Sequence, residues 1–152
     1  MNKYLTLVEE FISSFLDHSK ESIDLSDDKI NDLRIALLQE ELDELKVGIA
    51  NKDPREVLDA LVDLQYVLSG AVLKLGYKYV FDKAFEAVHE SNMSKMCNTP
   101  EEANATVAKY KADGVEAFIH LNSNGKYMIF RKTDNKILKS INYKKFDADK
   151  FI

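Results

Sequence analysis

The sequence predicts a mainly α-helical protein, a bundle of four to five helices followed by a small antiparallel β meander. Three observations lead to this prediction. The chain of 152 residues contains only 5 Gly and 2 Pro, too few for a turn-rich all-β fold or for disorder. Apolar residues recur at helical spacing before Gly114, and both prolines follow a residue that caps helices well. Apolar and polar residues begin to alternate only after Gly114.

Two helices are expected in the first third of the chain. The first covers residues 2–18, where apolar side chains form one stripe: Leu5, Val8, Phe11, Ile12 and Phe15. The polar segment 19–27 is expected to be a loop. Ser26 is predicted to cap the second helix, because two aspartates follow it and negative charge in a first turn favours the helix dipole. This helix is expected to end at Ala50.

The third helix has the clearest start signal in the sequence. Asp53 is the expected N-cap, Pro54 occupies the first helical position, and Glu56 stands where a capping box places a carboxylate. The helix is expected to cover residues 54–75 and to end at Gly76. Its apolar residues occupy most of its circumference, which predicts packing on more than one side. In so short a chain this predicts burial by a partner subunit, in a homodimer or a dimer of dimers.

The remainder of the chain is expected to contain two helices and a meander. The fourth helix covers about residues 79–95, and the fifth begins after the cap residue Thr99 and ends at Gly114. Three alternating segments joined by turn-like sequences predict three strands, at 116–121, 126–132 and 136–140. We therefore expect a helical domain over residues 1–97 and an appendage over residues 98–152.

Composition excludes several classes of protein. A single cysteine, Cys97, rules out an intrachain disulfide framework and, with only 3 His in the chain, a zinc site. The net charge of −5 divides into −10 over residues 1–107 and +5 over residues 108–152, and such an acidic body argues against nucleic-acid binding. No apolar run is long enough to span a membrane and the N-terminus does not resemble a signal peptide. A soluble cytoplasmic protein is expected.

Carboxylates form a stripe on each of two neighbouring predicted helices. The second helix carries Glu40, Glu41 and Glu44, and the third carries Glu56, Asp59 and Asp63. At about 100° per residue, each stripe occupies a narrow arc of its helix. Like charges at this spacing destabilise a helix unless a cation compensates them. Because Mg²⁺ prefers oxygen ligands and also binds phosphates, the stripes predict a magnesium site between the helices, with Mn²⁺ as an alternative ion.

The acidic stripes fit a solvated surface or a di-iron site less well than a magnesium site. Glutamate-rich helical faces are usually solvated, but the second stripe lies on a helix that is apolar almost all round, and aspartate is a poor residue for the middle of a helix. A di-iron carboxylate bundle requires paired Glu-x-x-His motifs. Only Glu86 and His89 have that spacing, and they lie away from the stripes. Magnesium therefore remains the preferred ion.

These motifs resemble the all-α nucleoside triphosphate pyrophosphohydrolases, which include the MazG proteins, the dimeric dUTPases and phosphoribosyl-ATP pyrophosphohydrolase. The family motif E-E-x-x-E matches residues 40–44, and E-x-x-D matches residues 56–59. The segments Ser91–Lys95 (SNMSK) and Ile137–Tyr143 (ILKSINY) resemble the phosphoribosyl-ATP-pyrophosphohydrolase-like branch. The resemblance implies the fold of the all-α NTP pyrophosphatases.

The resemblance also implies an activity, the Mg²⁺-dependent hydrolysis of a nucleoside triphosphate between the α and β phosphorus atoms. Glu40 and Glu44 would hold the metal, and Glu41 would orient or deprotonate the attacking water. The third helix would supply either Glu56 with Asp59 or Asp59 with Asp63, and the sequence leaves this choice open. A nucleotide house-cleaning role is preferred. The alternatives are phosphoribosyl-ATP hydrolysis in histidine biosynthesis and a non-catalytic helical dimerisation or binding module.

Candidate substrate contacts lie outside the acidic stripes. Asn92 and Lys95, three residues apart on one helical face, are candidates for binding phosphate or sugar. Three aromatic residues near the N-terminus could stack on a base or belong to the core: Tyr4, Phe11 and Phe15. Arg34 and Lys46 flank the first acidic motif and could reach phosphate or pair with acids. The preferred base, the number of metal ions and the role of the meander cannot be derived from the sequence.

Overall fold

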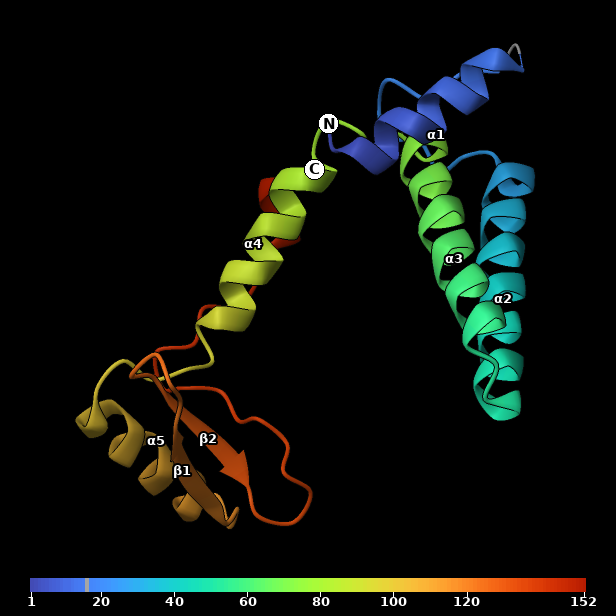
Figure 1. The fold of residues 1–152 in the computed structure, drawn as a ribbon. Coiled ribbons are helices and arrows are strands. Elements are labelled where there is room, and N and C mark those ends of the chain that lie inside the picture. Colours follow the sequence, from blue (N-terminus) through green and yellow to red (C-terminus); the bar gives the residue numbers. More distant parts are fainter. Residues whose placement is uncertain (16) are drawn as a thin grey trace. The chain divides into compact units, whose positions relative to one another are not determined.

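The computed structural model describes residues 1–15 and 17–152 and confirms a mainly α-helical fold. The described residues form five α-helices and a two-stranded antiparallel sheet (Figure 1). The contacts group the chain into two compact units, Met1–Asp82 with Ile152, and Lys83–Phe151. This division lies before the boundary at residue 97 that the sequence suggests. Each unit is described by itself below.

The N-terminal unit contains three helices, α1 (Lys3–Ser14), α2 (Asp28–Asn51) and α3 (Pro54–Lys74). α2 and α3 run antiparallel, side by side, as a helical hairpin (Figure 1). α1 packs on α3, and the buried core between them consists of Leu5, Val8, Ile12, Val72 and Leu73. The first helix is shorter than the predicted 2–18, and residue 16 of that range lies outside the described residues.

The helix caps confirm one sequence prediction and correct another. The Asp53 carboxylate accepts hydrogen bonds from the backbone N–H groups of Arg55 and Glu56, as predicted for the start of α3. The prediction that Ser26 caps α2 is wrong, because Asp27 accepts from the first N–H groups of that helix. The Ser26 hydroxyl instead donates to Asp24 at 2.6 Å.

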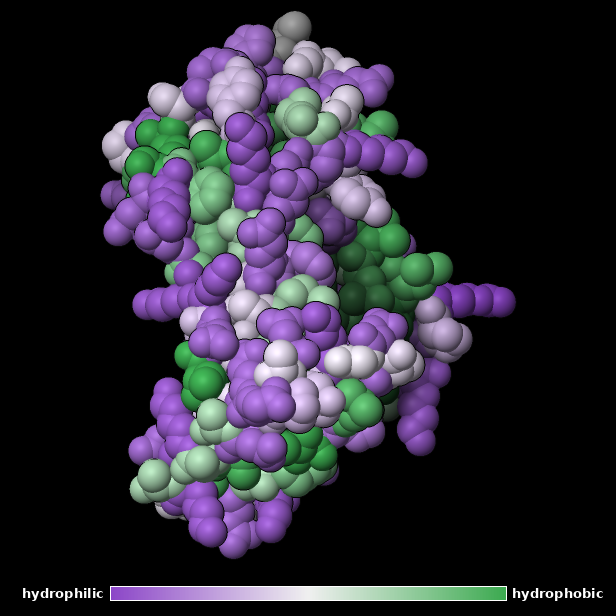
Figure 2. All heavy atoms as spheres, turned by 90° about the vertical axis from the view of Figure 1, so that its left-hand side faces the viewer, coloured by the Kyte–Doolittle hydropathy of each residue, from purple (hydrophilic) through white to green (hydrophobic). Residues whose placement is uncertain are grey.

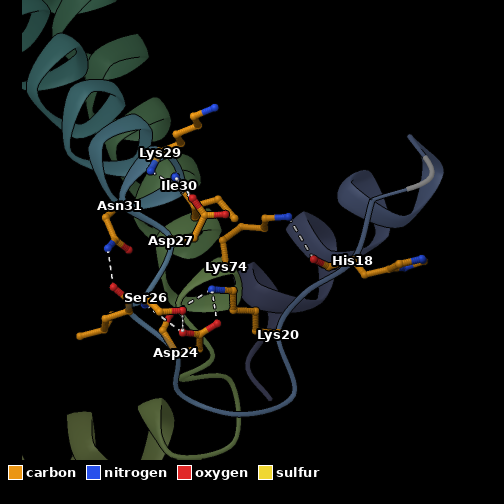
Figure 3. A network of polar contacts seen from close by, with 10 residues as sticks. His18, Lys20, Asp24, Ser26, Asp27, Lys29, Ile30, Asn31 and Lys74 are labelled. Atoms are coloured by element: carbon orange, nitrogen blue, oxygen red, sulfur yellow. Dashed lines mark hydrogen bonds and ion pairs between the residues drawn. The ribbon is translucent and has the colours of Figure 1, made fainter.

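The loop between α1 and α2 is fastened to the C-terminal end of α3 (Figure 3). The Lys74 ammonium donates to both carboxylate oxygens of Asp17, at 2.7 Å each, and to the carbonyl of His18 at 3.1 Å. Backbone N–H groups of Lys20 and Asp24 donate to carbonyls of the last turn of α3 and its cap, at 3.0 and 3.2 Å. These bonds determine where the chain enters α2.

The C-terminal unit is built on α5 and a small sheet. α4 (Phe81–Met93) leads into it, α5 (Pro100–Ala112) begins at the predicted cap Thr99, and a short 3₁₀ helix (Ala148–Lys150) lies near the end of the chain. β1 (Ala117–Leu121) and β2 (Tyr127–Arg131) pair antiparallel. Together with α5 they bury a second core: Cys97, Ala103, Ile129 and Leu138.

The predicted third strand at 136–140 is wrong. Ile137 forms a single bridge with Phe130, and Leu138 donates one backbone hydrogen bond to Ile129 at 2.8 Å. The chain then leaves the sheet, because the Ser140 N–H donates to the carbonyl of Lys95. A competing partner outside the sheet therefore ends the ladder, and the meander has two strands.

Part of the apolar surface of α3 is not covered by the described residues. Leu58 is 64% exposed, Val62 55% and Leu61 49%. The end of α3 from Ser69 to Lys74 is buried all round, as its sequence predicts, whereas these apolar residues nearer its start remain exposed. Apolar side chains reach the surface in patches between hydrophilic ones (Figure 2). Among the described helices, none combines the length and apolar character needed to cross a membrane.

Candidate active site

The α2–α3 hairpin places the two acidic stripes next to each other. The helices approach closely at Gly48, where a Cβ atom would lie only 3.1 Å from the backbone nitrogen of Val57. Because the helices are antiparallel, the turn containing Glu44 lies opposite the first turns of α3, and Glu41 lies opposite the following turn. The hairpin therefore aligns the E-E-x-x-E motif with the E-x-x-D motif.

The electrostatic environment of Glu41 shows that the stripes converge. The pKa of the Glu41 carboxyl is raised above its ordinary value, first by partial loss of water and then by four neighbouring carboxylates. In decreasing order of effect these are Glu44, Asp63, Glu40 and Asp59. Carboxylates of both helices thus repel the charge of Glu41, and a cation in their midst would relieve that repulsion.

One open cavity of about 910 Å³ joins the two stripes. Its lining residues are Glu40, Asp43, Glu44, Val47, Arg55, Glu56 and Asp59. Four of the five residues predicted to hold metal are therefore brought to one cavity. The fifth, Asp63, lies about one turn further along α3 and does not line it. The sequence left open whether α3 supplies Glu56 with Asp59 or Asp59 with Asp63. Of these two pairs, only Glu56 and Asp59 both line the cavity.

Two charged residues of this cavity, Asp43 and Arg55, were missed from the sequence. Asp43 accepts from Lys46 at 2.7 Å and from Gln39 at 2.9 Å, so its charge is already compensated. Lys46, a candidate phosphate contact, is engaged in that ion pair. Arg55 adds a guanidinium to an otherwise acidic cavity. Its position directly before Glu56 in the second motif was the available signal.

The donor set suits a hard divalent cation. Carboxylate oxygens in an open cavity match the preference of Mg²⁺, which takes few protein carboxylates and keeps several of its waters. In the described part of the chain, no three Asp, Glu, His or Cys side chains are close enough as placed to hold one ion. The carboxylates are on exposed side chains, which are free to change rotamer.

The two segments that resemble the phosphoribosyl-ATP-pyrophosphohydrolase-like branch meet in the C-terminal unit. The Ser91 and Tyr143 hydroxyls are hydrogen bonded at 3.1 Å, and Ser94 accepts from the Lys144 N–H at 2.9 Å. Asn92 and Lys95, the candidate substrate contacts, bond to each other through Lys95 Nζ and Asn92 Oδ1 at 2.7 Å. Fifty residues separate these segments in sequence, so only the fold reveals their proximity.

The fold and the site define a class of protein. The hairpin carries E-E-x-x-E on one arm and E-x-x-D on the other, and Glu40, Glu44, Glu56 and Asp59 line one cavity, whereas Glu41 does not line it. This arrangement is that of the all-α MazG-like NTP pyrophosphohydrolases. A family model described as Phosphoribosyl-ATP pyrophosphohydrolase matches residues 8–92, more than half of the chain, and the chain belongs to this family. Pyrophosphohydrolases are hydrolases that act on acid anhydrides. The resemblance seen in the motifs is thereby confirmed.

A viral protein is also similar to this chain. Over 108 residues it is 33% identical to an uncharacterized protein, L479, of Acanthamoeba polyphaga mimivirus. The match covers 66% of this chain but 41% of the relative, so the chain spans about two fifths of the relative's length.

Proposed function

We propose that this chain is a Mg²⁺-dependent pyrophosphohydrolase that converts a nucleoside triphosphate or its deoxy form to the monophosphate and pyrophosphate, in nucleotide house-cleaning. The observation that carries this proposal is the single cavity lined by carboxylates of both family motifs. The surrounding charges suit a polyanion only with a cation present, because carboxylates and phosphates repel each other.

In the proposed reaction, Glu40, Glu44, Glu56 and Asp59 would hold the metal. When bound, Mg²⁺ screens the phosphate charge and makes water more acidic. Glu41, half-buried beside these carboxylates, takes the proton from the attacking water. The water oxygen forms a bond to the α phosphorus, the bond from that phosphorus to the bridging oxygen breaks, and pyrophosphate leaves with the bridging oxygen.

Phosphoribosyl-ATP is the second candidate substrate, because the matching family model carries that name. Its scissile bond is the same kind of anhydride, so the acidic cavity by itself does not separate the candidates. The experiment is to incubate the purified protein with Mg²⁺, a panel of nucleoside and deoxynucleoside triphosphates, and phosphoribosyl-ATP, and to measure pyrophosphate. Preferred release from phosphoribosyl-ATP would replace the house-cleaning proposal.

Substitutions test the assigned residues. Glu41→Gln should lower kcat by about 10²- to 10⁴-fold, the usual contribution of a general base, and Asp59→Asn should raise the Mg²⁺ concentration needed for half-maximal rate. Asp32→Asn, an exposed acid on the same helix α2 but outside the cavity, is the matched control and should retain activity. If no substrate yields pyrophosphate and Mg²⁺ does not raise the melting temperature, the chain is a non-catalytic helical module.

We also propose a homodimer, or a dimer of dimers, formed through the exposed apolar face of α3. An apolar hollow of about 470 Å³ between α1 and α3 contains Tyr4, Leu7, Leu61 and Val62. An exposed apolar surface of this kind favours association. Sedimentation at micromolar concentration should show at least twice 17.4 kDa, and Leu61→Asp should reduce this mass. A wild-type monomer would contradict the proposal.

A further inference from the structure

A second cavity of about 260 Å³ in the N-terminal unit has aromatic walls. Phe11 and Phe15 of the first helix and its cap, and Tyr66 of α3, surround it together with Arg34 of α2. The Phe11 ring lies 4.8 Å from that of Phe15 and 5.9 Å from that of Tyr66, measured between centroids. These rings are not core residues, because Phe15 is 70% and Phe11 49% exposed. They form an aromatic surface that is open to a ligand.

Arg34 lines this cavity and carries an unpartnered hydrogen-bond donor. Its Nε atom is buried and has no hydrogen-bond partner. The nearest acid, Asp17, gives both carboxylate oxygens to Lys74 at 2.7 Å. Gly70 leaves room for the guanidinium, since a Cβ there would lie 3.2 Å from Arg34 Nη1. A buried donor without an acceptor is costly, and the guanidinium that carries it belongs to a residue lining the cavity.

The aromatic cavity lies at a defined distance from the acidic one. Arg34 precedes Glu41, which belongs to the first motif but does not line the acidic cavity, by seven residues on α2. Tyr66 follows Asp59, which lines that cavity, by seven residues on α3. Seven residues are nearly two turns, so each pair shares a helix face about 10 Å apart. Because the helices are antiparallel, both displacements point in the same direction along the hairpin. This separation is comparable to that between the α phosphate and the base of a nucleotide.

From these observations we infer that the aromatic cavity binds the base of the substrate, stacked on Phe15 and Tyr66, with Arg34 donating to a ring nitrogen or carbonyl of the base. This inference rests on the proposed function, because it takes the acidic cavity as the triphosphate site. Aromatic side chains and guanidinium groups are the usual partners of unstacked bases. The base, rather than the triphosphate alone, would then determine substrate affinity.

The test compares a nucleoside triphosphate with ribose 5-triphosphate, which lacks a base. For the wild-type enzyme we expect KM for ribose 5-triphosphate to be at least tenfold higher. Tyr66→Leu and Arg34→Met should raise KM for the nucleotide to a similar extent, leave KM for ribose 5-triphosphate unchanged, and alter kcat by less than threefold. Tyr79→Leu, which removes a 65% exposed aromatic ring outside the cavity, should leave both KM values unchanged.

Two outcomes with the Tyr66→Leu variant would overturn the inference. If Tyr66→Leu raises KM equally for both substrates, or changes the sedimenting mass without changing the preference for the base, the cavity serves the fold or an interface. A direct measurement separates this inference from the proposed function. Nucleoside 5′-monophosphates without metal should shift NMR resonances of Phe15 and Tyr66 even if no substrate is hydrolysed, and the absence of such shifts at millimolar nucleotide would refute base binding.

Discussion

Gly76→Ala should destabilise the N-terminal unit far more than an ordinary glycine substitution. Gly76 has φ +84°, and a Cβ added there would overlap the carbonyl oxygen of Ser22 and lie 2.8 Å from the nitrogen of Ile23. The positive φ alone costs an alanine about 1 to 2 kcal/mol. Relief of the overlap requires the loop to move away from the end of α3.

Movement of the loop would weaken the two backbone hydrogen bonds that fasten it, from Lys20 to Leu73 and from Asp24 to Leu75. Each such bond contributes about 0.5 to 1.5 kcal/mol. We therefore expect the free energy of unfolding to fall by about 2 to 5 kcal/mol, a large part of the roughly 5 to 15 kcal/mol of an ordinary domain. Because the loop leads into α2, catalysis should also fall in the protein that remains folded.

Urea denaturation followed by far-UV circular dichroism measures the effect. Gly114→Ala is the matched control, because Gly114 also has a positive φ, +76°, but a Cβ there would have no neighbouring atom within 4 Å. That variant should lose only about 1 to 2 kcal/mol. If Gly76→Ala loses no more stability than Gly114→Ala, the contact between the loop and the end of α3 does not contribute as argued.

Three further predictions concern buried or half-buried side chains. Lys78→Met should lower the free energy of unfolding, measured by urea denaturation, by about 2 kcal/mol, because the nearly buried ammonium donates to Glu9 and Ser19. The control Lys132→Met, at an exposed lysine, should lower it by less than about 0.5 kcal/mol. Equal losses in the two variants would contradict this reasoning. The Ser19 hydrogen bond, with help from Lys78, lowers the pKa of Glu9 below 4.5, so this carboxylate contributes stability above pH 4.5 that is lost as the pH falls through the lowered pKa. The melting temperature of Glu9→Gln should therefore depend less on pH between 5 and 3 than that of the wild type, and identical pH profiles would refute the assignment. Ile129→Ala, at a fully buried position of the second core, should lower the free energy of unfolding by about 3 kcal/mol, and a loss below 1 kcal/mol would show that β2 does not organise this core.

Local signals in the sequence predicted several elements correctly. The caps Asp53 and Thr99 were predicted because each precedes a proline, and both side chains accept backbone hydrogen bonds at the start of a helix. The prediction failed where neighbours compete. Ser26 is a good cap residue, but Asp24 accepts from its hydroxyl, and Asp27 takes the cap position. Capping propensity shows that a residue is able to cap a helix, whereas the conformation and hydrogen bonds of the loop determine which residue occupies the cap position.

The candidate site was predictable in composition but not in shape. The spacing of Glu40, Glu44, Glu56 and Asp59 predicted carboxylates on adjacent helix faces, and the structure brings these four to one cavity. The place of Arg55 in that cavity was not predictable, because it depends on how closely the hairpin closes at Gly48.

The sequence by itself determined the helices, the caps Asp53 and Thr99, and the acidic stripes, because these follow from periodicity and from hydrogen bonds between residues a few positions apart. The tertiary structure alone decided features that depend on residues far apart in the chain. It places the two acidic stripes next to each other and leaves Arg34 Nε buried without an acceptor. It also ends the sheet after β2, because the Ser140 N–H donates to the carbonyl of Lys95. Such pairings depend on how whole elements pack, which no local pattern in the sequence encodes.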